Sequence, residues 1–337
     1  MNGSSVSFQT MIKEASIVVD TCIKIRKGEK VLIGTDSARS HEADSIASLC
    51  NARGAEVLIV DLSPYVLPIK AGRYVDPPDR FKDMMKSSNV TILVTSQEYS
   101  QRFSHKIHYF LNQTAECCVY QVDEDMGLWD YSMEDVQKVM ENGNKILNFM
   151  KQAKWVHVTS KRGTDVKFCI QERECLPALP ILPRPPMQAA DPIPLWGELN
   201  WAPIENLSVG RVVVDGILMR WGSESAISEP VEWQVRDGRI VDITGGPEAT
   251  EFKRTLESAD PNAYIIGELG IGASHKGKLG TMQEKGILGT VHLGVGSNKG
   301  VYPGGTNVSQ IHGDGSIRDI SIEVDGKQMI SDGKLII

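Results

Sequence analysis

The chain has 337 residues, of which 41% are hydrophobic and 23% are charged. This is the composition of an ordinary globular protein, and the length suffices for one large domain or for two. The net charge of −7 argues against nucleic acid and against an anionic membrane surface as partners, because either would require a basic face. We therefore expect the ligand to be a small molecule or a short peptide.

Targeting and membrane segments are not evident in the sequence. Residues 1–15 lack a basic stretch followed by an apolar one, and no run of about 18 apolar residues occurs. The six cysteines form neither a CxxC pair nor a repeated spacing, which argues against a zinc ribbon or a disulfide framework. We expect a cytoplasmic protein with reduced, buried thiols.

The first half of the chain alternates between amphipathic segments and short apolar runs. This alternation predicts a parallel sheet with crossover helices, and therefore an α/β domain. The predicted strands are 29–35, 56–62, 90–96 and 117–123. The predicted helices are 8–25, 39–53, 79–87, 106–115 and 132–151. No G-x-G-x-x-G follows the first strand, so a nucleotide-binding fold is not supported.

A proline-rich stretch, residues 175–203, separates this half from the second. Proline at this density is excluded from helix and sheet interiors, so we expect a long extended connection there. We place an α/β domain at 1–155 and a β-rich α+β domain that carries the metal site at 156–337.

The second half is rich in glycine and β-branched residues and predicts mainly antiparallel strands. Asp237-Gly238 and Asp325-Gly326 lie between alternating apolar runs, as hairpin turns do. One helix is expected near 247–258.

Strand alternation in the segment 290–296 places His292 on a face whose other members are small. These members are Thr290, Gly294 and Gly296. The opposite face is apolar and is expected to pack in the core. Because the space in front of the imidazole is open, the pattern favours a ligand or catalytic group over a core histidine.

Three acidic positions and a second histidine add candidate metal ligands. His312 and Asp314 lie two residues apart and point the same way on an extended chain, so they can bind one cation. A simple histidine–carboxylate hydrogen bond is the alternative. Glu268 lies in an apolar, glycine-spaced run where a buried carboxylate is costly without a cation, unless it reaches solvent. Glu198 is flanked by tryptophans and leaves both interpretations open.

The segments that carry these residues resemble a known family. WGELNWAP, GELGIGAS, QEKGILGTVHLGVGSN, YPGGTN and IHGD are similar, in this order, to the metal-site segments of the thermophilic leucyl aminopeptidases, also called aminopeptidase T. The resemblance covers about residues 155–325, and the first half agrees only in general pattern. It implies a two-domain homodimer with two divalent cations, Zn, Mn or Co, held by Glu198, Glu268, His292, His312 and Asp314.

The same superfamily includes the 2,5-dihydroxypyridine ring-cleaving dioxygenases, whose pattern differs. They hold one Fe²⁺ with two histidines and an aspartate, and a histidine stands where this chain has Glu268. Their positions that match Glu198 and His292 are apolar. This chain has polar side chains at all five ligand positions, which favours a hydrolase. Deaminases of nitroaromatic acids also resemble this group, so the substrate need not be a peptide.

The resemblance predicts a metal-dependent hydrolase, aminopeptidase-like or acting on a small nitrogenous or aromatic substrate, in which a metal-activated water attacks the substrate. Glu198 and Glu268 would bridge the cations or move protons, and Tyr302 or His275 would donate hydrogen bonds to the transition state. The family tyrosine aligns with Lys299, so Tyr302 takes its place only if the alignment shifts.

Two other functions remain open at this point. One is an Fe(II) ring-cleaving dioxygenase of the 2,5-dihydroxypyridine type that uses His292, His312 and a carboxylate. The other is a metal-stabilised binding protein without turnover. A serine hydrolase is not supported, because no G-x-S-x-G segment occurs. His105 and His108 lie on a predicted helix, as part of a solvated face or directed toward the site.

Overall fold

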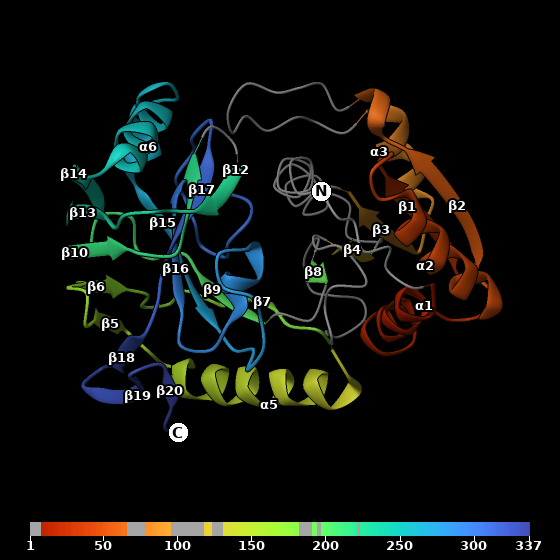
Figure 1. The fold of residues 1–337 in the computed structure, drawn as a ribbon, viewed down its shortest axis with the longest axis horizontal. Coiled ribbons are helices and arrows are strands. Elements are labelled where there is room, and N and C mark those ends of the chain that lie inside the picture. The colour runs from red at the N-terminus through yellow and green to blue at the C-terminus, as the bar shows by residue number, and fades with distance from the viewer. Residues whose placement is uncertain are drawn as a thin grey trace. The chain divides into compact units, whose positions relative to one another are not determined.

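The computed structural model describes residues 8–65, 78–95, 118–122, 131–181, 191–193, 197–220 and 223–337. These residues form two compact units (Figure 1). The first unit contains the described residues up to 137 and those between 179 and 195. The second contains those from 138 to 178 and from 196 onward. The chain therefore leaves the first unit, returns to it and leaves it again, which a single division at 155 and 156 does not describe.

The first unit is built on a five-stranded sheet in the order β2-β1-β3-β4-β8, in which every pair of neighbours is parallel. Its strands are β1 (Lys30–Thr35), β2 (Glu56–Asp61), β3 (Val90–Val94), β4 (Cys118–Val122) and β8 (Asp191–Ile193). All of β3 is buried, as expected for a continuous apolar run in a sheet covered on both faces. The four strands predicted in this half are confirmed.

The helices predicted in this half are also present where the structure describes them. They are α1 (Phe8–Ser16), which continues as a π-helix (Ile17–Ile23), α2 (Ser40–Ala52), α3 (Asp79–Lys86) and α5 (Met133–Met150). Apolar side chains from α2 and the π-helix share one core with β1 and β3. The predicted helix 106–115, with His105 and His108 beside and within it, lies outside the described residues.

The second unit contains two antiparallel sheets. The eight-stranded sheet consists, in spatial order, of β14 (Arg239–Gly245), β13 (Val231–Arg236), β10 (Val209–Val214), β6 (Asp165–Cys169), β5 (Trp155–Ser160), β18 (Ile320–Val324), β19 (Lys327–Ser331) and β20 (Lys334–Leu335). The seven-stranded sheet consists of β12 (Ser223–Ala226), β11 (Ile217–Arg220), β17 (His312–Ile317), β16 (Val291–Gly296), β15 (Ile266–Gly272), β9 (Glu198–Trp201) and β7 (Leu176–Ala178). The coarse prediction of a mixed α/β protein with a β-rich second half is thus confirmed.

One face of the seven-stranded sheet packs into the core of this unit. A Cβ built on Gly315 of β17 would lie 2.7 Å from the Trp233 ring of β13, so the two sheets approach closely there. Trp233 also stacks on Phe252 of α6 (Pro247–Glu257), with ring centroids 5.1 Å apart. The opposite face of the sheet carries the polar side chains described below.

Both predicted hairpin turns are confirmed. Asp237 and Gly238 join β13 to β14 with φ angles of 48° and 72°, and Asp325 and Gly326 join β18 to β19 with 48° and 81°. Two successive positive φ values are typical of type I′ turns, which match the twist of antiparallel strands.

The prediction of a long connection over 175–203 was wrong in part, because three short strands lie there. Two of them, β7 and β8, contain Pro177 and Pro192. They are edge strands of their sheets, where the missing N–H of proline does not interrupt a ladder. The third, β9, contains no proline and lies between β7 and β15. In the described part of the chain, no helix is long and apolar enough to span a bilayer.

Candidate metal centre

Four neighbouring strands bring the five predicted ligands to one face of the seven-stranded sheet. In the register of β16 and β17, Gly294 is opposite Asp314 and Gly296 is opposite His312. Gly294 is also paired with Glu268 of β15. Glu198 begins β9, the strand on the other side of β15. The alternation predicted for His292, and that predicted for the pair His312 and Asp314, is therefore present.

Glycines make room for these side chains. Gly270 is opposite His292, and a Cβ at Gly270 would lie 2.0 Å from the imidazole. A Cβ at Gly294 would lie 2.6 Å from Glu268 Oε2 and 2.8 Å from the ring of His312. All three distances are shorter than real Cβ contacts, which are essentially never under 3.0 Å. The small residues around His292 therefore form the floor on which the larger ionisable groups lie.

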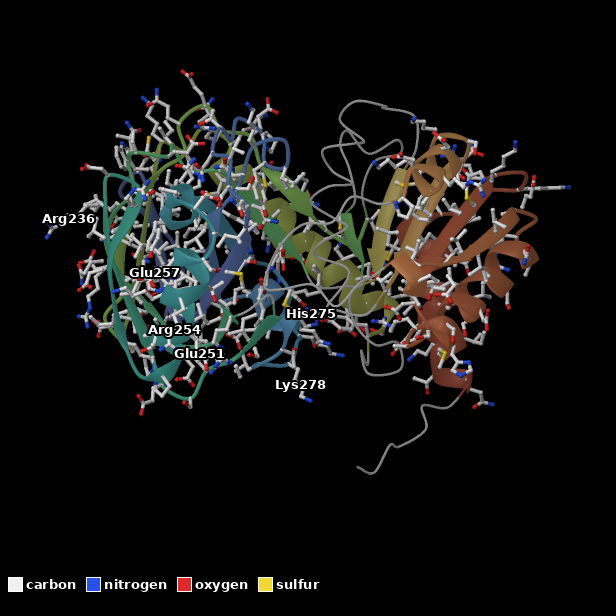
Figure 2. All side chains as sticks on the ribbon, turned by 90° about the horizontal axis from the view of Figure 1, so that it is seen from above. Arg236, Glu251, Arg254, Glu257, His275 and Lys278 are labelled. Atoms are coloured by element: carbon white, nitrogen blue, oxygen red, sulfur yellow. The ribbon has the colours of Figure 1, made fainter. Side chains whose placement is uncertain are left out.

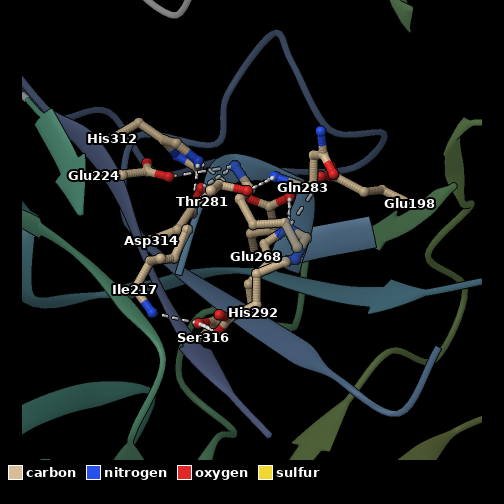
Figure 3. Close-up of polar contacts among 12 residues, drawn as sticks. Glu198, Ile217, Glu224, Glu268, Thr281, Gln283, His292, His312, Asp314 and Ser316 are labelled. Carbon is tan, nitrogen blue, oxygen red and sulfur yellow. Dashed lines mark hydrogen bonds and ion pairs between the residues drawn. The ribbon is translucent and has the colours of Figure 1, made fainter. Parts of the chain in front are cut away.

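We call Glu198, Glu268, His292, His312 and Asp314 the acid–imidazole cluster (Figure 3). Glu268 lies between the histidines, with Oε1 at 3.3 Å from His292 Nε2 and Oε2 at 2.9 Å from His312 Nε2. His312 Nε2 is also 3.4 Å from Asp314 Oδ1. Glu198 Oε2 is 4.0 Å from His292 Nε2. The cluster is buried, since the exposed fractions of its members range from 0% for His292 to 7% for His312.

The carboxylates create a strongly negative environment. Burial and the charge of Asp314 would raise the pKa of Glu268, but its hydrogen bonds to both histidines lower that pKa to about 2. Burial would lower the pKa of His312, but its hydrogen bonds and attraction to Asp314 and Glu268 raise it to about 10. Burial also raises the pKa of Glu198. The cluster thus favours any positive charge placed within it.

The donor set fits a divalent cation. Glu268, His292 and Asp314 each offer one atom, and these atoms lie within 4.8 Å of one another. Among the described residues, Glu198 Oε1, His292 Nδ1 and Asp314 Oδ1 are buried without a hydrogen bond. Buried polar atoms rarely lack a partner, so these atoms point to a ligand. Imidazole nitrogens with carboxylate oxygens suit Fe²⁺, Zn²⁺ or Mn²⁺.

His312 makes a hydrogen bond of the kind that orients metal-binding histidines. His312 Nδ1 is 2.8 Å from the backbone oxygen of Ser297. If Nδ1 carries the proton and donates it there, Nε2 is left with a lone pair directed into the cluster. Hydrogen bonds of this kind orient metal-binding imidazoles and fix their tautomer.

The two further catalytic candidates occupy different positions. The hydroxyl of Tyr302 is 3.4 Å from His312 Nε2, and the Tyr302 side chain is buried. It is therefore adjacent to the cluster, although the alignment placed another residue at the family tyrosine. His275 is exposed and lies three residues after the end of β15, on the same loop as Lys278 (Figure 2). A role for His275 in the reaction remains a prediction.

Sequence analysis missed two charged residues at the site. The ammonium of Lys285, in the 3₁₀ turn Met282–Gly286, is 2.6 Å from Asp314 Oδ2. Glu224 of β12 approaches the same ammonium, with Oε2 at 3.7 Å. Neither residue belongs to a periodic pattern of buried polar positions. The one available indication was that QEKG lies within a segment that resembles a metal-site segment.

A buried donor set of imidazoles and carboxylates on a β-sheet, in an α/β chain of this size, defines a candidate metal-dependent enzyme. Comparison with protein families makes this class specific. The chain belongs to the family of NicX, 2,5-dihydroxypyridine 5,6-dioxygenase, whose match spans residues 11–337. No curated protein matches the sequence.

Solved structures of both branches of the superfamily share this fold. The 2,5-dihydroxypyridine dioxygenase from Pseudomonas putida KT2440 superposes with a TM-score of 0.77 at 18% identity, covering 98% of each chain. AmpT from Thermus thermophilus superposes with a TM-score of 0.68 at 12% identity, covering 98% of this chain and 99% of AmpT. At these identities the likeness shows the fold alone. The predicted resemblance to a superfamily that contains both kinds of protein is confirmed.

The family match changes the balance between the two enzyme interpretations. The sequence favoured a hydrolase because polar side chains occur at all five ligand positions. Membership of the dioxygenase family over nearly the whole chain supports the ring-cleaving alternative better.

Proposed function

We propose that this chain is a metal-dependent dioxygenase that opens a hydroxylated nitrogen-containing aromatic ring. The observation that carries the proposal is the buried pair His292 and His312 around the carboxylate of Glu268, in a chain that belongs to the 2,5-dihydroxypyridine 5,6-dioxygenase family. Two imidazoles and one carboxylate that leave other positions open are the ligand set of non-haem Fe(II) oxygenases.

In this proposal His292 and His312 supply two nitrogens, and Glu268 or Asp314 supplies the carboxylate. Bound Fe²⁺ would allow O₂ and the hydroxylated ring to react at one place. The balanced reaction breaks one carbon–carbon bond of the ring and places both oxygen atoms in the product. It requires no external reductant, because the ring supplies the electrons.

The protein's own groups have two further tasks. Burial raises the pKa of Glu198, which makes this carboxylate a stronger base for accepting a proton from a ring hydroxyl and returning it later. The Tyr302 hydroxyl, next to His312, is placed to donate a hydrogen bond to a group bound at the cluster. Because all of these side chains are buried, bulk water is kept from the reacting groups.

Oxygen consumption tests the proposal directly. Protein loaded with Fe²⁺ under anaerobic conditions would be mixed with 2,5-dihydroxypyridine and air-saturated buffer, and O₂ uptake followed at an electrode. We expect one O₂ per ring opened and two ¹⁸O atoms in the product when ¹⁸O₂ is used. His312→Ala is the control and should consume no O₂ above background. Failure of several hydroxypyridines and hydroxybenzoates to elicit uptake would contradict the proposal.

A metal-dependent hydrolase is the second candidate, and one observation favours it. Glu198 and Glu268 give the cluster more carboxylates than an Fe(II) triad requires, in an arrangement compatible with bridged cations. Here a metal-bound water would attack an amide or an amine. Product formation from leucyl peptides or aromatic amines without O₂, in protein loaded with Zn²⁺, Mn²⁺ or Co²⁺, would favour this candidate over the dioxygenase.

Cytoplasmic location and a homodimeric state remain predictions. They are testable by cell fractionation and by light scattering of the purified protein.

A further inference from the structure

Lys285 is a buried cation next to the candidate ligands. Its ammonium is 2.6 Å from Asp314 Oδ2 and 3.7 Å from Glu224 Oε2, and only 8% of the residue is exposed. Lysine is almost never buried unless it is paired. Glu198 and Glu268 also attract the ammonium electrostatically, so the charge of one lysine interacts with four carboxylates.

The backbone next to Lys285 is held firmly. The side chain of the preceding residue, Glu284, accepts hydrogen bonds from Gly280 N, Ser316 Oγ and Arg318 Nη2 at 2.6, 2.5 and 2.6 Å. The Glu284 carbonyl accepts a bond from Thr290 Oγ1 at 2.7 Å. Glu284 is fully buried. The turn that carries Lys285 is thus fixed to β17, the strand that carries Asp314.

The two oxygens of Asp314 have different surroundings. Oδ2 binds the Lys285 ammonium, whereas Oδ1 faces His312 and makes no hydrogen bond with a described residue. In a centre with two metal ions about 3.5 to 4 Å apart, a bridging carboxylate gives one oxygen to each ion. Here one of the two oxygens already has a positively charged partner that belongs to the chain.

The charge balance of the cluster also argues against a second metal ion. Four buried carboxylates next to two divalent ions are neutral as a group, and a lysine added to that group leaves a net positive charge in a buried site. With Lys285 in place, one divalent ion leaves a single negative charge, which a neutral hydrogen-bond donor such as the Tyr302 hydroxyl can offset. Uncompensated buried charge is costly, so the lysine opposes a second ion.

We propose that the Lys285 ammonium takes the place of a second metal ion beside Asp314, so that the cluster binds one divalent cation although it has the ligands for two. Lys285 is therefore a residue that determines metal number. The ion pair of Lys285 with Asp314 Oδ2 also holds Asp314 in a fixed orientation toward the ion. The inference shares with the proposed function only the premise that the cluster binds metal.

Metal counting without substrate tests this inference. Chelator-treated protein would be titrated with Mn²⁺ under argon, and bound metal would be measured by elemental analysis after desalting and by the electron paramagnetic resonance of free Mn²⁺. The wild type should bind one ion per chain. Lys285→Met removes the charge but keeps the stem and should bind two. Lys285→Arg keeps the charge and should bind one. Lys278→Met is the matched control, because Lys278 is exposed and lies in the same connection between β15 and β16, and it should bind one.

Two results would overturn the inference. One is a wild type that binds two ions. The other is a folded Lys285→Met protein that still binds one ion with unchanged affinity, which would make Lys285 a simple ion-pair partner. If circular dichroism shows that Lys285→Met does not fold, Lys285→Gln replaces it, and the wild-type count stands as a test by itself. A protein that binds one ion but takes up no O₂ would contradict the proposed function and leave this inference intact.

Discussion

Two groups of buried charged side chains lie on the same face of the seven-stranded sheet, and their hydrogen bonding differs. In the first, which we call the Glu284 network, Glu284 receives donors from Gly280, Ser316 and Arg318. Ser316 in turn accepts a hydrogen bond from Ile217 N at 2.7 Å. In the second, the acid–imidazole cluster, three carboxylates contact two imidazoles and several buried atoms have no hydrogen bond among the described residues.

This difference in hydrogen bonding distinguishes buried charges that stabilise the fold from buried charges that are suited to bind a ligand. A carboxylate whose oxygens all have donors contributes to the stability of the fold. A cluster that leaves atoms without partners and gathers like charges is stable only because the surrounding strands hold it, and a bound cation would complete it. Substitutions in the cluster should therefore affect ligand binding, and substitutions in the network should affect stability.

The largest effect on binding is expected from His312→Ala. This change removes a nitrogen that contacts both Glu268 and Asp314, so metal retention and turnover should be lost while the circular dichroism spectrum stays that of the wild type. The loss should exceed the roughly 10- to 100-fold that follows from removing partners outside the ligand shell. Elemental analysis and oxygen uptake measure both losses. His157→Ala, which removes a histidine from the other sheet, is the control, and normal metal content in His312→Ala would contradict the assignment.

The largest effect on stability is expected from Glu284→Gln. The substitution breaks the ion pair between the buried Glu284 and the partly exposed Arg318, and it replaces an acceptor of hydrogen bonds with a group that must also donate. The free energy of unfolding in urea should fall by about 3 to 5 kcal/mol. Metal affinity of the folded variant should change much less than in His312→Ala. A variant with wild-type stability would show that the network is not structural.

A smaller effect, on binding rather than stability, is expected from Gly270→Ala. The new Cβ would lie 2.0 Å from the His292 imidazole, so the ring must shift and metal affinity should fall by about 10- to 100-fold. Gly313→Ala is the matched control, because its Cβ would meet Met219 Sδ at 2.0 Å on the opposite face. It should cost about 1 to 3 kcal/mol of stability and leave metal affinity unchanged. Calorimetric metal titration distinguishes the two.

The smallest effect is expected at Glu248, a carboxylate that lies outside both groups and accepts two hydrogen bonds from Ser228. Hydrogen bonds from Ser228 Oγ and N, at 2.6 and 2.9 Å, lower the pKa of Glu248 to about 2, below its ordinary value of 4.5. A lowered carboxyl pKa stabilises the fold above the unfolded value, and this contribution disappears as the pH falls from about 4.5 to about 2. Glu248→Gln should therefore lower the urea midpoint at pH 7 but not near pH 2, with metal binding unchanged.

The elements that follow from a periodic sequence pattern could be predicted from the sequence alone. The strands of the parallel sheet follow from continuous apolar runs, since both faces of such a sheet are covered. The shared face of His292 and the small residues follows from alternation with a period of two. The same rule placed His312 and Asp314 together on β17. Convergence of Glu198 and Glu268 on these residues was inferred from the resemblance, because nothing in the sequence indicates which strands are neighbours.

Periodicity could not identify Lys285 and Glu224 as residues of the site. Lys285 is in a 3₁₀ turn of five residues, which has no periodic face, and its partner Asp314 is 29 residues away. Glu224 lies in a four-residue strand at the edge of the sheet. Their importance depends on tertiary pairing, which decides whether a charged residue in a short segment is solvated or buried.

The proline-rich stretch shows a related limit. The rule that proline avoids sheet interiors holds, but edge strands satisfy it as well as a loop does. Sequence alone therefore did not distinguish a connection from β7 and β8.

The course of the backbone through 176–201 has a practical consequence for dissecting the protein. β7 and β9 belong to the seven-stranded sheet, and β8, between them in sequence, completes the parallel sheet. A truncation after residue 155 would produce an N-terminal fragment without its edge strand and a C-terminal fragment that carries that strand unpaired. Neither fragment would contain all the strands of its sheets and no others. Expressing the two units separately would therefore require a circularly permuted or spliced gene instead of a truncation.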